Sequence, residues 1–497
     1  MVRNIRIEGD TMSEIRSRFA PSPTGYMHIG NLRTALYAYL IAKKDPNGKF
    51  ILRIEDTDQT RQVEGAEEII YNTLKQCHLE HDEGPDIGGP VGPYVQSVRM
   101  HEGIYMEYAK KLVRLGGAHY CFCDEDDVEA QREIQNARGE SFKFDDPCRL
   151  LSIEEAEARV AAGEPFVIRQ TIPAEGTTSF EDEVFGRITV ENSTLDDQVL
   201  IKRDGFPTYN FANVIDDHLM GITDVVRGME YLSSAPKYNL LYQAYGWDIP
   251  RYIHCPPVMK DQTHKLSKRN GDASFEDLIA KGYLPEAILN YIALLGWSPE
   301  TNQEIYTLDE LKQAFNVKRI GQSGAIFDIM KLTSINALWL RGMSLDNYYE
   351  LIKPYIDQAV KGDFDKKKIA AVVQQRANTL VEIPEMLDFF DTFPAFSTDL
   401  YVNKKMKSNE EISLESLKAA REALAGIGEW TETTIHDTLM ELPEKLGRKN
   451  GQVLFPVRVA ITGKQFTPGG AIEIADILGK EETLRRLDLS IAQLENA

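Results

Sequence analysis

Two short segments, about 240 residues apart, carry residue types that bind and polarise phosphate. The first is RFAPSPTGYMHIGN, residues 18–31, in which two prolines stiffen a turn directly before His28 and Gly30. Apolar residues then recur at helical spacing, so we expect a helix to begin near Asn31. Its unpaired N–H groups would bind an anion, with His28 as a hydrogen-bond donor and Gly30 giving access to the backbone.

The second segment is KLSKR, residues 265–269, on a Gly-containing stretch that we interpret as a mobile loop. Lys265, Ser267 and Lys268 are suited to a polyphosphate whose negative charge moves to the leaving group as a P–O bond breaks. Any basic loop resembles this segment when it is taken alone. The interpretation therefore depends on both segments occurring together.

The elements that must position these residues follow from the hydrophobic pattern. Between residues 15 and 115, short alternating runs and helical runs follow one another, as in the βαβ units of a parallel sheet. From the Gly- and Pro-rich stretch DEGPDIGGPVGPY to about Lys202, charged helical pieces mix with strands, and we interpret this part as an insertion. Beyond Thr307 the pattern is almost entirely helical. The predicted fold is a Rossmann-type α/β domain with an α+β insertion, followed by an all-α C-terminal region.

Composition narrows the class of protein. The 497 residues are 42% hydrophobic, which predicts several globular domains. The longest apolar runs are far shorter than a membrane span, and the first residues lack the apolar core of a signal peptide, so we expect a cytoplasmic protein without membrane contact. The formal net charge of -21 weighs mildly against a nucleic-acid partner, although short basic clusters occur. Five cysteines form no even disulfide framework, and we expect reduced thiols.

The motifs resemble those of a known family. HIGN at 28–31 and KLSKR at 265–269 are similar to the HIGH and KMSKS signatures of class I aminoacyl-tRNA synthetases, with Asn31 and Arg269 as departures. RFAPSPTGYMHIG, FILRIEDTD, DEGPDIGGPVGPYVQS and DDHLMGITDVVRGMEYL resemble the bacterial glutamyl-tRNA synthetases in particular. QVLFPVRVAITG is similar to the anticodon-binding region of that family. The resemblance covers nearly the whole chain.

The resemblance implies ATP-dependent ligation of L-glutamate to tRNA(Glu) through glutamyl-adenylate, with release of AMP and diphosphate and with Mg²⁺ on the ATP. The alternative is an enzyme that also glutamylates tRNA(Gln), and we expect a monomer. Implied catalytic residues are His28, Gly30, Lys265 and Lys268. Implied ATP-binding residues are His28, Gly30, Asn31, Glu230, Lys265, Ser267 and Lys268. Implied glutamate-binding residues are Arg18, Ala20, Ser22, Glu55, Tyr209, Asn213 and Arg227.

The same resemblance divides the chain into four parts. A Rossmann catalytic domain comprises 13–110 and 205–250, and an acceptor-stem-binding insertion comprises 111–204. The KLSKR loop and a stem-contact region comprise 251–335, and a helical anticodon-binding region comprises 336–497.

Three cysteines raise the question of a metal. Cys121, Cys123 and Cys148 resemble the zinc site of some family members. Where those relatives offer a fourth ligand, this chain has Phe144 and Leu150, which bind no metal; His119 is the remaining candidate but lies off the pattern. The sequence therefore favours buried thiols over zinc.

Three other functions agree less well with the sequence. A glutaminyl-tRNA synthetase shares the ancestry but has a β-barrel C-terminal region, whereas this one has a helical pattern. A glutamyl-queuosine tRNA(Asp) synthetase lacks an anticodon-binding region, and 497 residues argue against it. A catalytically inactive tRNA-binding paralogue is opposed by the intact His28, Lys265 and Lys268.

Overall fold

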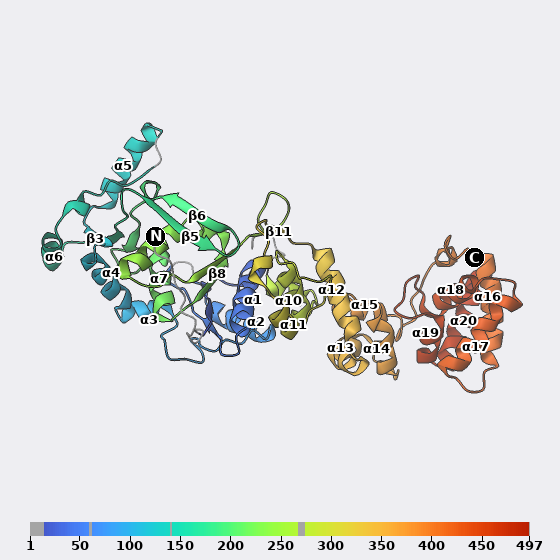
Figure 1. The fold of residues 1–497 in the computed structure, drawn as a ribbon. Coiled ribbons are helices and arrows are strands. Elements are labelled where there is room, and N and C mark those ends of the chain that lie inside the picture. The colour runs from blue at the N-terminus through green and yellow to red at the C-terminus, as the bar shows by residue number, and fades with distance from the viewer. Residues whose placement is uncertain (1–13, 59–61, 140–141, 267–273, 497) are drawn as a thin grey trace. The chain divides into compact units, whose positions relative to one another are not determined.

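The computed structural model describes residues 14–58, 62–139, 142–266 and 274–496. The chain forms two compact units (Figure 1). The first contains the described residues up to Leu278 together with Ile288–Asp328, and the second contains Ile279–Ala287 and Ile329–Ala497. No helix among the described residues is long and apolar enough to cross a membrane.

A six-stranded sheet organises the first unit, in the order β2-β1-β8-β9-β5-β6. Five strands run parallel to one another, and the sixth, β6, pairs antiparallel with β5. The strands are β1 (Arg16–Phe19), β2 (Lys49–Leu52), β5 (Thr177–Asp182), β6 (Gly186–Glu191), β8 (Asp224–Gly228) and β9 (Arg251–Cys255). Because β1 has its sequential partner β2 on one side and β8 on the other, the chain reverses direction of winding at β1, where open α/β sheets bind ligands.

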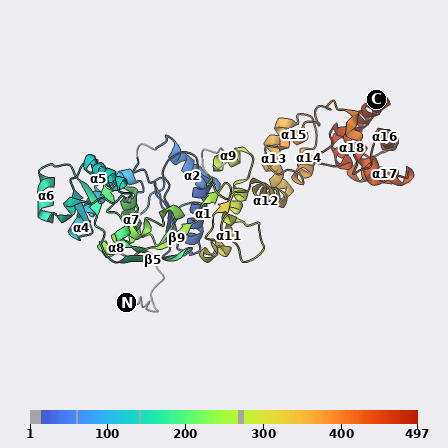
Figure 2. The ribbon, with the colours of Figure 1, turned by 90° about the horizontal axis from the view of Figure 1, so that it is seen from above.

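Helices surround this sheet (Figure 2). Helix α1 packs on β1 and β8, and α8 packs on β5. The helices of this part are α1 (Ile29–Lys43), α2 (Ala66–Gln76), α3 (Gln96–His101), α4 (Ile104–Arg114), α7 (Tyr209–Leu219), α8 (Ala235–Tyr245) and α11 (Leu308–Ala314). Two more, α9 (Phe275–Ala280) and α10 (Pro285–Leu294), have residues in both units. A two-stranded sheet pairs β10 (Val258–Met259) with β11 (Ala325–Ile326).

Helix α1 begins at Ile29, two residues before the expected start. The reason is that His28 is its N-cap: the imidazole Nδ1 accepts a hydrogen bond from the Gly30 N–H at 3.0 Å. This bond satisfies one of the unpaired N–H groups of the first turn and draws Ile29 into the helix. The apolar residues that follow are buried on almost every side of α1.

The part of the chain between β2 and β8 contains a second, smaller sheet. Strands β3 (Ala118–Cys121), β4 (Val167–Gln170) and β7 (Val199–Ile201) pair antiparallel in the order β3-β4-β7. Helices α5 (Glu125–Ala137) and α6 (Ile153–Ala161) are capped by Asp124 and Ser152, each in a capping box. The β5–β6 hairpin, which also lies within residues 111–204, extends the large sheet instead.

The named elements of the second unit are all helical in its described residues. The α-helices that lie wholly within it are α12 (Ile329–Gly342), α13 (Leu345–Ala359), α14 (Lys366–Gln374), α15 (Ile383–Leu387), α16 (Glu410–Ala425), α17 (Glu432–Lys445), α18 (Asn450–Thr462), α19 (Ala471–Leu478) and α20 (Lys480–Glu495). Arg486 is fully buried among them and donates to the carbonyl groups of Phe389, Phe390 and Ile461. The predicted fold class, with a Rossmann-type sheet and an all-α C-terminal region, is confirmed. The boundaries of the four predicted parts stay a prediction.

Candidate functional site

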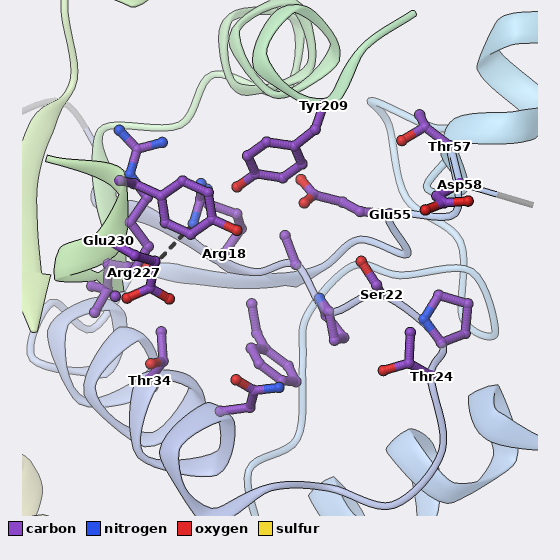
Figure 3. Close-up of a pocket in the computed structure, with 18 of the residues that line it drawn as sticks. Arg18, Ser22, Thr24, Thr34, Glu55, Thr57, Asp58, Tyr209, Arg227 and Glu230 are labelled. Carbon is purple, nitrogen blue, oxygen red and sulfur yellow. Dashed lines mark hydrogen bonds between the residues drawn. The ribbon is translucent and has the colours of Figure 1, made fainter. Parts of the chain in front are cut away.

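A pocket of about 430 Å³ opens at the carboxyl ends of β1, β2 and β8 (Figure 3). Its volume suits a small molecule or part of a larger one. The walls come from the end of β1 and the turn after it, the loop after β2, the first residue of α7 and the end of β8. The lining residues that the sequence had singled out are Arg18, Ala20, Ser22, Asn31, Glu55, Tyr209, Arg227 and Glu230.

Arg18 and Glu55, which line the pocket, are linked by hydrogen bonds through Arg53 and Asp217, which do not line it. Arg18 donates from Nε and Nη2 to the two oxygens of Asp217, at 3.0 and 3.3 Å, and from Nη1 to the Val226 carbonyl at 3.2 Å. Arg53 donates from Nη1 to Asp217 and from Nη2 to Glu55, both at 2.8 Å. All four side chains are buried. A network in which every charge has a partner fixes the direction of each side chain.

The two carboxyl groups of this network have their pKa values shifted in opposite directions. Burial raises the pKa of Glu55, and the neighbouring Arg53 and Arg18 offset only part of that effect. Burial also opposes ionisation of Asp217, but there Arg18 and Arg53 prevail and hold its pKa below the usual range. Asp217 is therefore a fixed negative charge that holds two guanidinium groups. Glu55 gains from an additional cation in the pocket.

Arg227 differs from Arg18 because no carboxylate of the described residues lies within ion-pair distance of it. Its guanidinium lies among aromatic rings, with the centroids of Tyr231, Tyr238 and Tyr252 at 5.4, 4.6 and 5.3 Å. The Nη2 atom is buried and has no hydrogen-bond partner among the described residues. A buried guanidinium without an anion is costly, so this pocket favours an anionic ligand.

The opposite side of the site is the start of α1. Because Nδ1 of His28 accepts from the Gly30 N–H, the neutral imidazole carries its proton on Nε2 and is a donor there. A Cβ on Gly30 would lie 3.1 Å from Nδ1 of His28, so glycine is needed for the position of this ring as well as for access to the backbone. Neither His28 nor Gly30 lines the pocket itself; Asn31 and Thr34 of the same helix do.

The second signature is only partly described. Lys265 is exposed on a hairpin arm, where it pairs with Met259. Ser267 and Lys268 lie outside the described residues. Ser274, the first described residue after them, forms a β-bridge with His28. The residue at which the described chain resumes after the second signature therefore pairs by its backbone with His28 of the first signature.

One of the predicted glutamate-binding residues does not line the pocket, and several polar lining residues were not predicted. Asn213 is buried in α7, where it donates to the Tyr209 carbonyl at 2.7 Å, and it does not line the pocket. The lining residues with polar side chains that were not predicted are Thr24, Thr34, Thr57, Asp58, Gln62 and Tyr231. The polar run after Glu55 was the available signal for Thr57 and Asp58.

The cysteines form a cluster on the smaller sheet. The sulfur atoms of Cys121, Cys123 and Cys148 and a carboxylate oxygen of Asp146 all lie within 4.8 Å of one another. Cys123 Sγ is 3.8 Å from Cys148 Sγ and 3.9 Å from Asp146 Oδ1. Two sulfur ligands of a tetrahedral zinc ion, each about 2.3 Å from the metal, would be separated by about 3.8 Å. The spacing of these atoms therefore fits a tetrahedral metal site.

The sequence offered no fourth ligand at the expected positions, but the structure places a carboxylate oxygen of Asp146 in the cluster, where it could hold a metal ion together with the three sulfur atoms. This residue precedes Cys148 by two positions and is the N-cap of the 3₁₀ helix η2 (Pro147–Leu150), where its carboxylate accepts from the Cys148 N–H and lies near the sulfur atoms. The His119 Nε2 atom lies 3.1 Å from Asp146 Oδ2 and orients the carboxylate, so His119 supports the cluster from outside. All five cysteines of the chain are free thiols, as expected.

The comparisons with known proteins agree with this geometry. Residues 14–334 match the family model of the class I tRNA synthetases (E and Q), catalytic domain, and residues 347–491 match the model of the anticodon binding domain. The glutamate–tRNA ligase of Clostridium tetani is 61% identical over 97% of this chain and 99% of that protein. The ligase of Clostridium acetobutylicum is 56% identical over the same shares. A crystal structure of a glutamate tRNA ligase from Elizabethkingia meningosepticum, in complex with its amino acid, is similar with a TM-score of 0.87 and 35% identity, covering 97% of this chain and 100% of that one.

The chain is a class I tRNA synthetase. The family model of the catalytic domain matches it, and the structure agrees: a polar pocket lies at the carboxyl ends of parallel strands, at the point where the strand order reverses, and helix α1 begins beside it at His28. Within that class, the chain belongs to the glutamate–tRNA ligase family. The resemblance that the motifs indicated is confirmed.

Proposed function

We propose that this chain ligates L-glutamate to tRNA(Glu) in two steps. In the first, a carboxylate oxygen of glutamate attacks the α-phosphorus of ATP, the bond to the bridging oxygen breaks, and glutamyl-adenylate and diphosphate form. In the second, a terminal adenosine hydroxyl of the tRNA attacks the glutamyl carbonyl, and AMP leaves. The observation that carries the proposal is a single pocket holding two buried guanidinium groups and one buried carboxylate, the complement of a molecule with two carboxylates and an ammonium group.

The roles in glutamate binding follow from these charges. Arg18 and Arg227 bind the carboxylates, and Glu55 accepts from the ammonium group. Arg18 has three of its five N–H donors occupied by Asp217 and Val226, which leaves two for a ligand. Ala20, Ser22 and Tyr209 complete the walls, while Asn213 acts indirectly by holding the first turn of α7.

ATP binds between the start of α1 and the second signature. His28 donates from Nε2 to a phosphate oxygen, and Gly30 and Asn31 offer the helix start to the phosphates. Glu230 of the 3₁₀ helix η4 (Met229–Tyr231) contributes to the nucleotide side of the pocket. Lys265, Ser267 and Lys268 stabilise the charge that leaves with the diphosphate. ATP enters as its Mg²⁺ complex, in which the metal screens the phosphates.

The tRNA is bound by parts outside the pocket. The insertion at 111–204 contacts the acceptor stem, and residues 336–497 contact the anticodon, in agreement with the anticodon binding domain matched at 347–491. We further propose that the chain acts as a monomer. We place the reaction in the cytoplasm, because charged tRNA is consumed by translating ribosomes.

The cysteine cluster holds a structural zinc ion in this proposal. Cys121, Cys123, Cys148 and Asp146 would be the four ligands, and no solvent position is needed for chemistry. The ion would fix η2 to β3 within the insertion and so shape the surface offered to the acceptor stem.

The test of the function is aminoacylation with labelled glutamate on two separate transcripts. Charging of tRNA(Glu) alone supports the proposal in its narrow form, and charging of tRNA(Gln) as well supports the alternative of an enzyme with both substrates. Pyrophosphate exchange with tRNA present tests the remaining alternative. No exchange and no charging in the folded protein would show a non-catalytic tRNA-binding paralogue.

A further inference from the structure

Three buried polar side chains on neighbouring strands are linked by hydrogen bonds, and the last of them lines the pocket. His254 of β9 stands directly beside Arg227 of β8 in the register of the sheet, and Asp182 ends β5 on the other side of β9. The exposed fractions of Asp182, Arg227 and His254 are 4%, 5% and 0%. Asp182 and His254 do not line the pocket, whereas Arg227 does.

The hydrogen bonds run from Arg227 through His254 to Asp182, with each residue donating to the next. Asp182 Oδ2 accepts from Nδ1 of His254 at 2.6 Å and from its backbone N–H at 3.2 Å. Arg227 donates from Nε to Nε2 of His254 at 3.1 Å. The other oxygen, Oδ1 of Asp182, accepts from the backbone N–H groups of Val184 and Phe185, both at 2.9 Å. Both carboxylate oxygens are therefore committed as acceptors.

These bonds require a single tautomer of His254. A carboxylate only accepts, so Nδ1 carries the proton and Nε2 presents a lone pair. Arg227 has only donors, and it needs that lone pair for its Nε–H. Burial lowers the pKa of His254, Asp182 opposes that shift, and Arg227 adds to it. The neutral ring with its proton on Nδ1 is the form that satisfies both neighbours.

Fixing Nε of Arg227 fixes the plane of the guanidinium. The rings of Tyr231, Tyr238 and Tyr252 surround the group, and Nη2 remains without a partner among the described residues. An arginine that is held at Nε offers its outer nitrogen atoms as a preset fork to a carboxylate.

We propose that Asp182 and His254 are positioning residues for the reaction: they hold Arg227 in the orientation in which it binds a carboxylate of glutamate. The inference rests on the proposed function, since Arg227 is the residue that touches the substrate. Its basis is the geometry of three adjacent strands, in which β5, from the segment between the two halves of the catalytic sheet, reaches the amino-acid pocket through β9.

Asp182→Asn tests the proposal because it keeps the shape and changes the tautomer. The two backbone N–H groups of Val184 and Phe185 retain the amide oxygen, so the amide NH₂ faces Nδ1 of His254, and the backbone N–H of His254 loses its acceptor. His254 must then accept at Nδ1 and carry its proton on Nε2, where it opposes the Nε–H of Arg227. A serine-protease triad responds to the equivalent change in the same way, through the wrong tautomer.

In aminoacylation of tRNA(Glu), the KM for glutamate should rise about tenfold or more in Asp182→Asn, while the KM for ATP stays within about twofold. Spectra of ¹⁵N-histidine-labelled protein should show the proton of His254 moving from Nδ1 to Nε2. Asp224→Asn is the matched control: it changes a buried aspartate of the same sheet that pairs with Arg251, outside the pocket, and should leave the KM for glutamate unchanged.

An unchanged KM for glutamate in Asp182→Asn, or an equal rise in the KM for ATP, would overturn the proposal. If Asp182→Asn does not fold, His254→Gln and His254→Asn decide. The glutamine amide reaches the place of Nε2 and should keep the lower KM, whereas the asparagine amide does not, so equal KM values in the two variants also overturn the proposal. A wild-type protein that charges no tRNA with glutamate would instead contradict the proposed function.

Discussion

Arg18 and Asp217 form a buried two-point ion pair, with Nε–Oδ1 at 3.0 Å and Nη2–Oδ2 at 3.3 Å. The same carboxylate receives Arg53 at 2.8 Å, and Arg53 in turn holds Glu55. Arg18, which lines the pocket, is thus held in place by a carboxylate that does not line it. Any change at Arg18 acts on both the ligand and this network.

Arg18→Gln should lower kcat/KM for glutamate by roughly a hundredfold or more, because charge-assisted hydrogen bonds contribute about 1.5–3 kcal/mol each and two are lost. The preference for glutamate over glutamine should narrow. The side-chain NH₂ of glutamine points its donors at the donors of Arg18, and this unfavourable contact is absent from the variant. Thermal denaturation should show a lower Tm, because Asp217 loses one of its guanidinium partners. The measurement is activation of both amino acids with tRNA present. A collapse of ATP affinity with an unchanged glutamate-to-glutamine ratio would place Arg18 in the nucleotide site.

Gly30→Ala should reduce pyrophosphate exchange by about tenfold or more, because the added Cβ lies 3.1 Å from the His28 ring and turns it away from the phosphates. The fall should appear in kcat, with little change in the KM for glutamate. Gly342→Ala is the matched control, since a Cβ at that helical position meets nothing within 4 Å. Equal activity of the two variants would remove the role assigned to the helix start.

The parts of this site that the sequence predicted are those carried by continuous segments. FILRIED and VVRGMEYL each run along one strand and the turn after it, and HIGN begins the helix that follows β1, so local pattern and family resemblance together place His28, Glu55 and Arg227 at one sheet edge. The supporting pairs were not predictable in this way. Arg18 and Asp217 are 199 positions apart, and no local pattern pairs two charges over that distance.

Asp146 was missed for a different reason. The motif fixes ligands by their spacing, and the expected positions hold Phe144 and Leu150. The 3₁₀ turn at Pro147–Leu150 moves a neighbouring carboxylate into the cluster, and the tightness of that turn is a property of the backbone. Asp182 was also overlooked, because it lies in the segment interpreted as an insertion, whereas β5 belongs to the large sheet.

Lys268→Ala should slow adenylate formation by orders of magnitude and leave Tm almost unchanged, because the ammonium group is proposed to act on charge that appears only in the transition state. The measurement is the single-turnover rate with tRNA bound. Lys404→Ala, in the helical C-terminal unit, is the control and should retain the wild-type rate. A wild-type rate in Lys268→Ala would contradict the role.

Cys123→Ser and Asp146→Asn should both lower the zinc content from about one ion per chain, measured by mass spectrometry on protein produced with zinc, and the cysteine variant should lose more because thiolate is the stronger ligand. The KM for tRNA should rise in Cys123→Ser, while pyrophosphate exchange at saturating tRNA stays near wild type. Cys77→Ser, which alters a buried thiol outside the cluster, should keep its zinc. Wild-type protein without zinc would contradict the proposed site.

The helical C-terminal unit should carry a pH-dependent stability that comes from Glu482. Hydrogen bonding by Arg485, together with Arg486, holds the pKa of Glu482 at about 2, against 4.5 for an ordinary glutamate. A depressed carboxyl pKa stabilises the folded state fully above the unfolded value and loses that contribution as the pH falls through the folded value. The contribution should therefore be complete above about pH 4.5 and decline toward pH 2.

Glu482→Gln should remove this dependence. At neutral pH its free energy of unfolding in urea should be lower than that of the wild type by up to about 3 kcal/mol, an upper bound because solvent screens a side chain that is 29% exposed. The difference should shrink as the pH falls below about 4.5, since the wild type then loses what the variant already lacks. Glu481→Gln, at the exposed neighbouring position of α20, should follow the wild type throughout. A gap between Glu482→Gln and the wild type that stays constant down to pH 2.5 would contradict the coupling of Glu482 to Arg485 and Arg486.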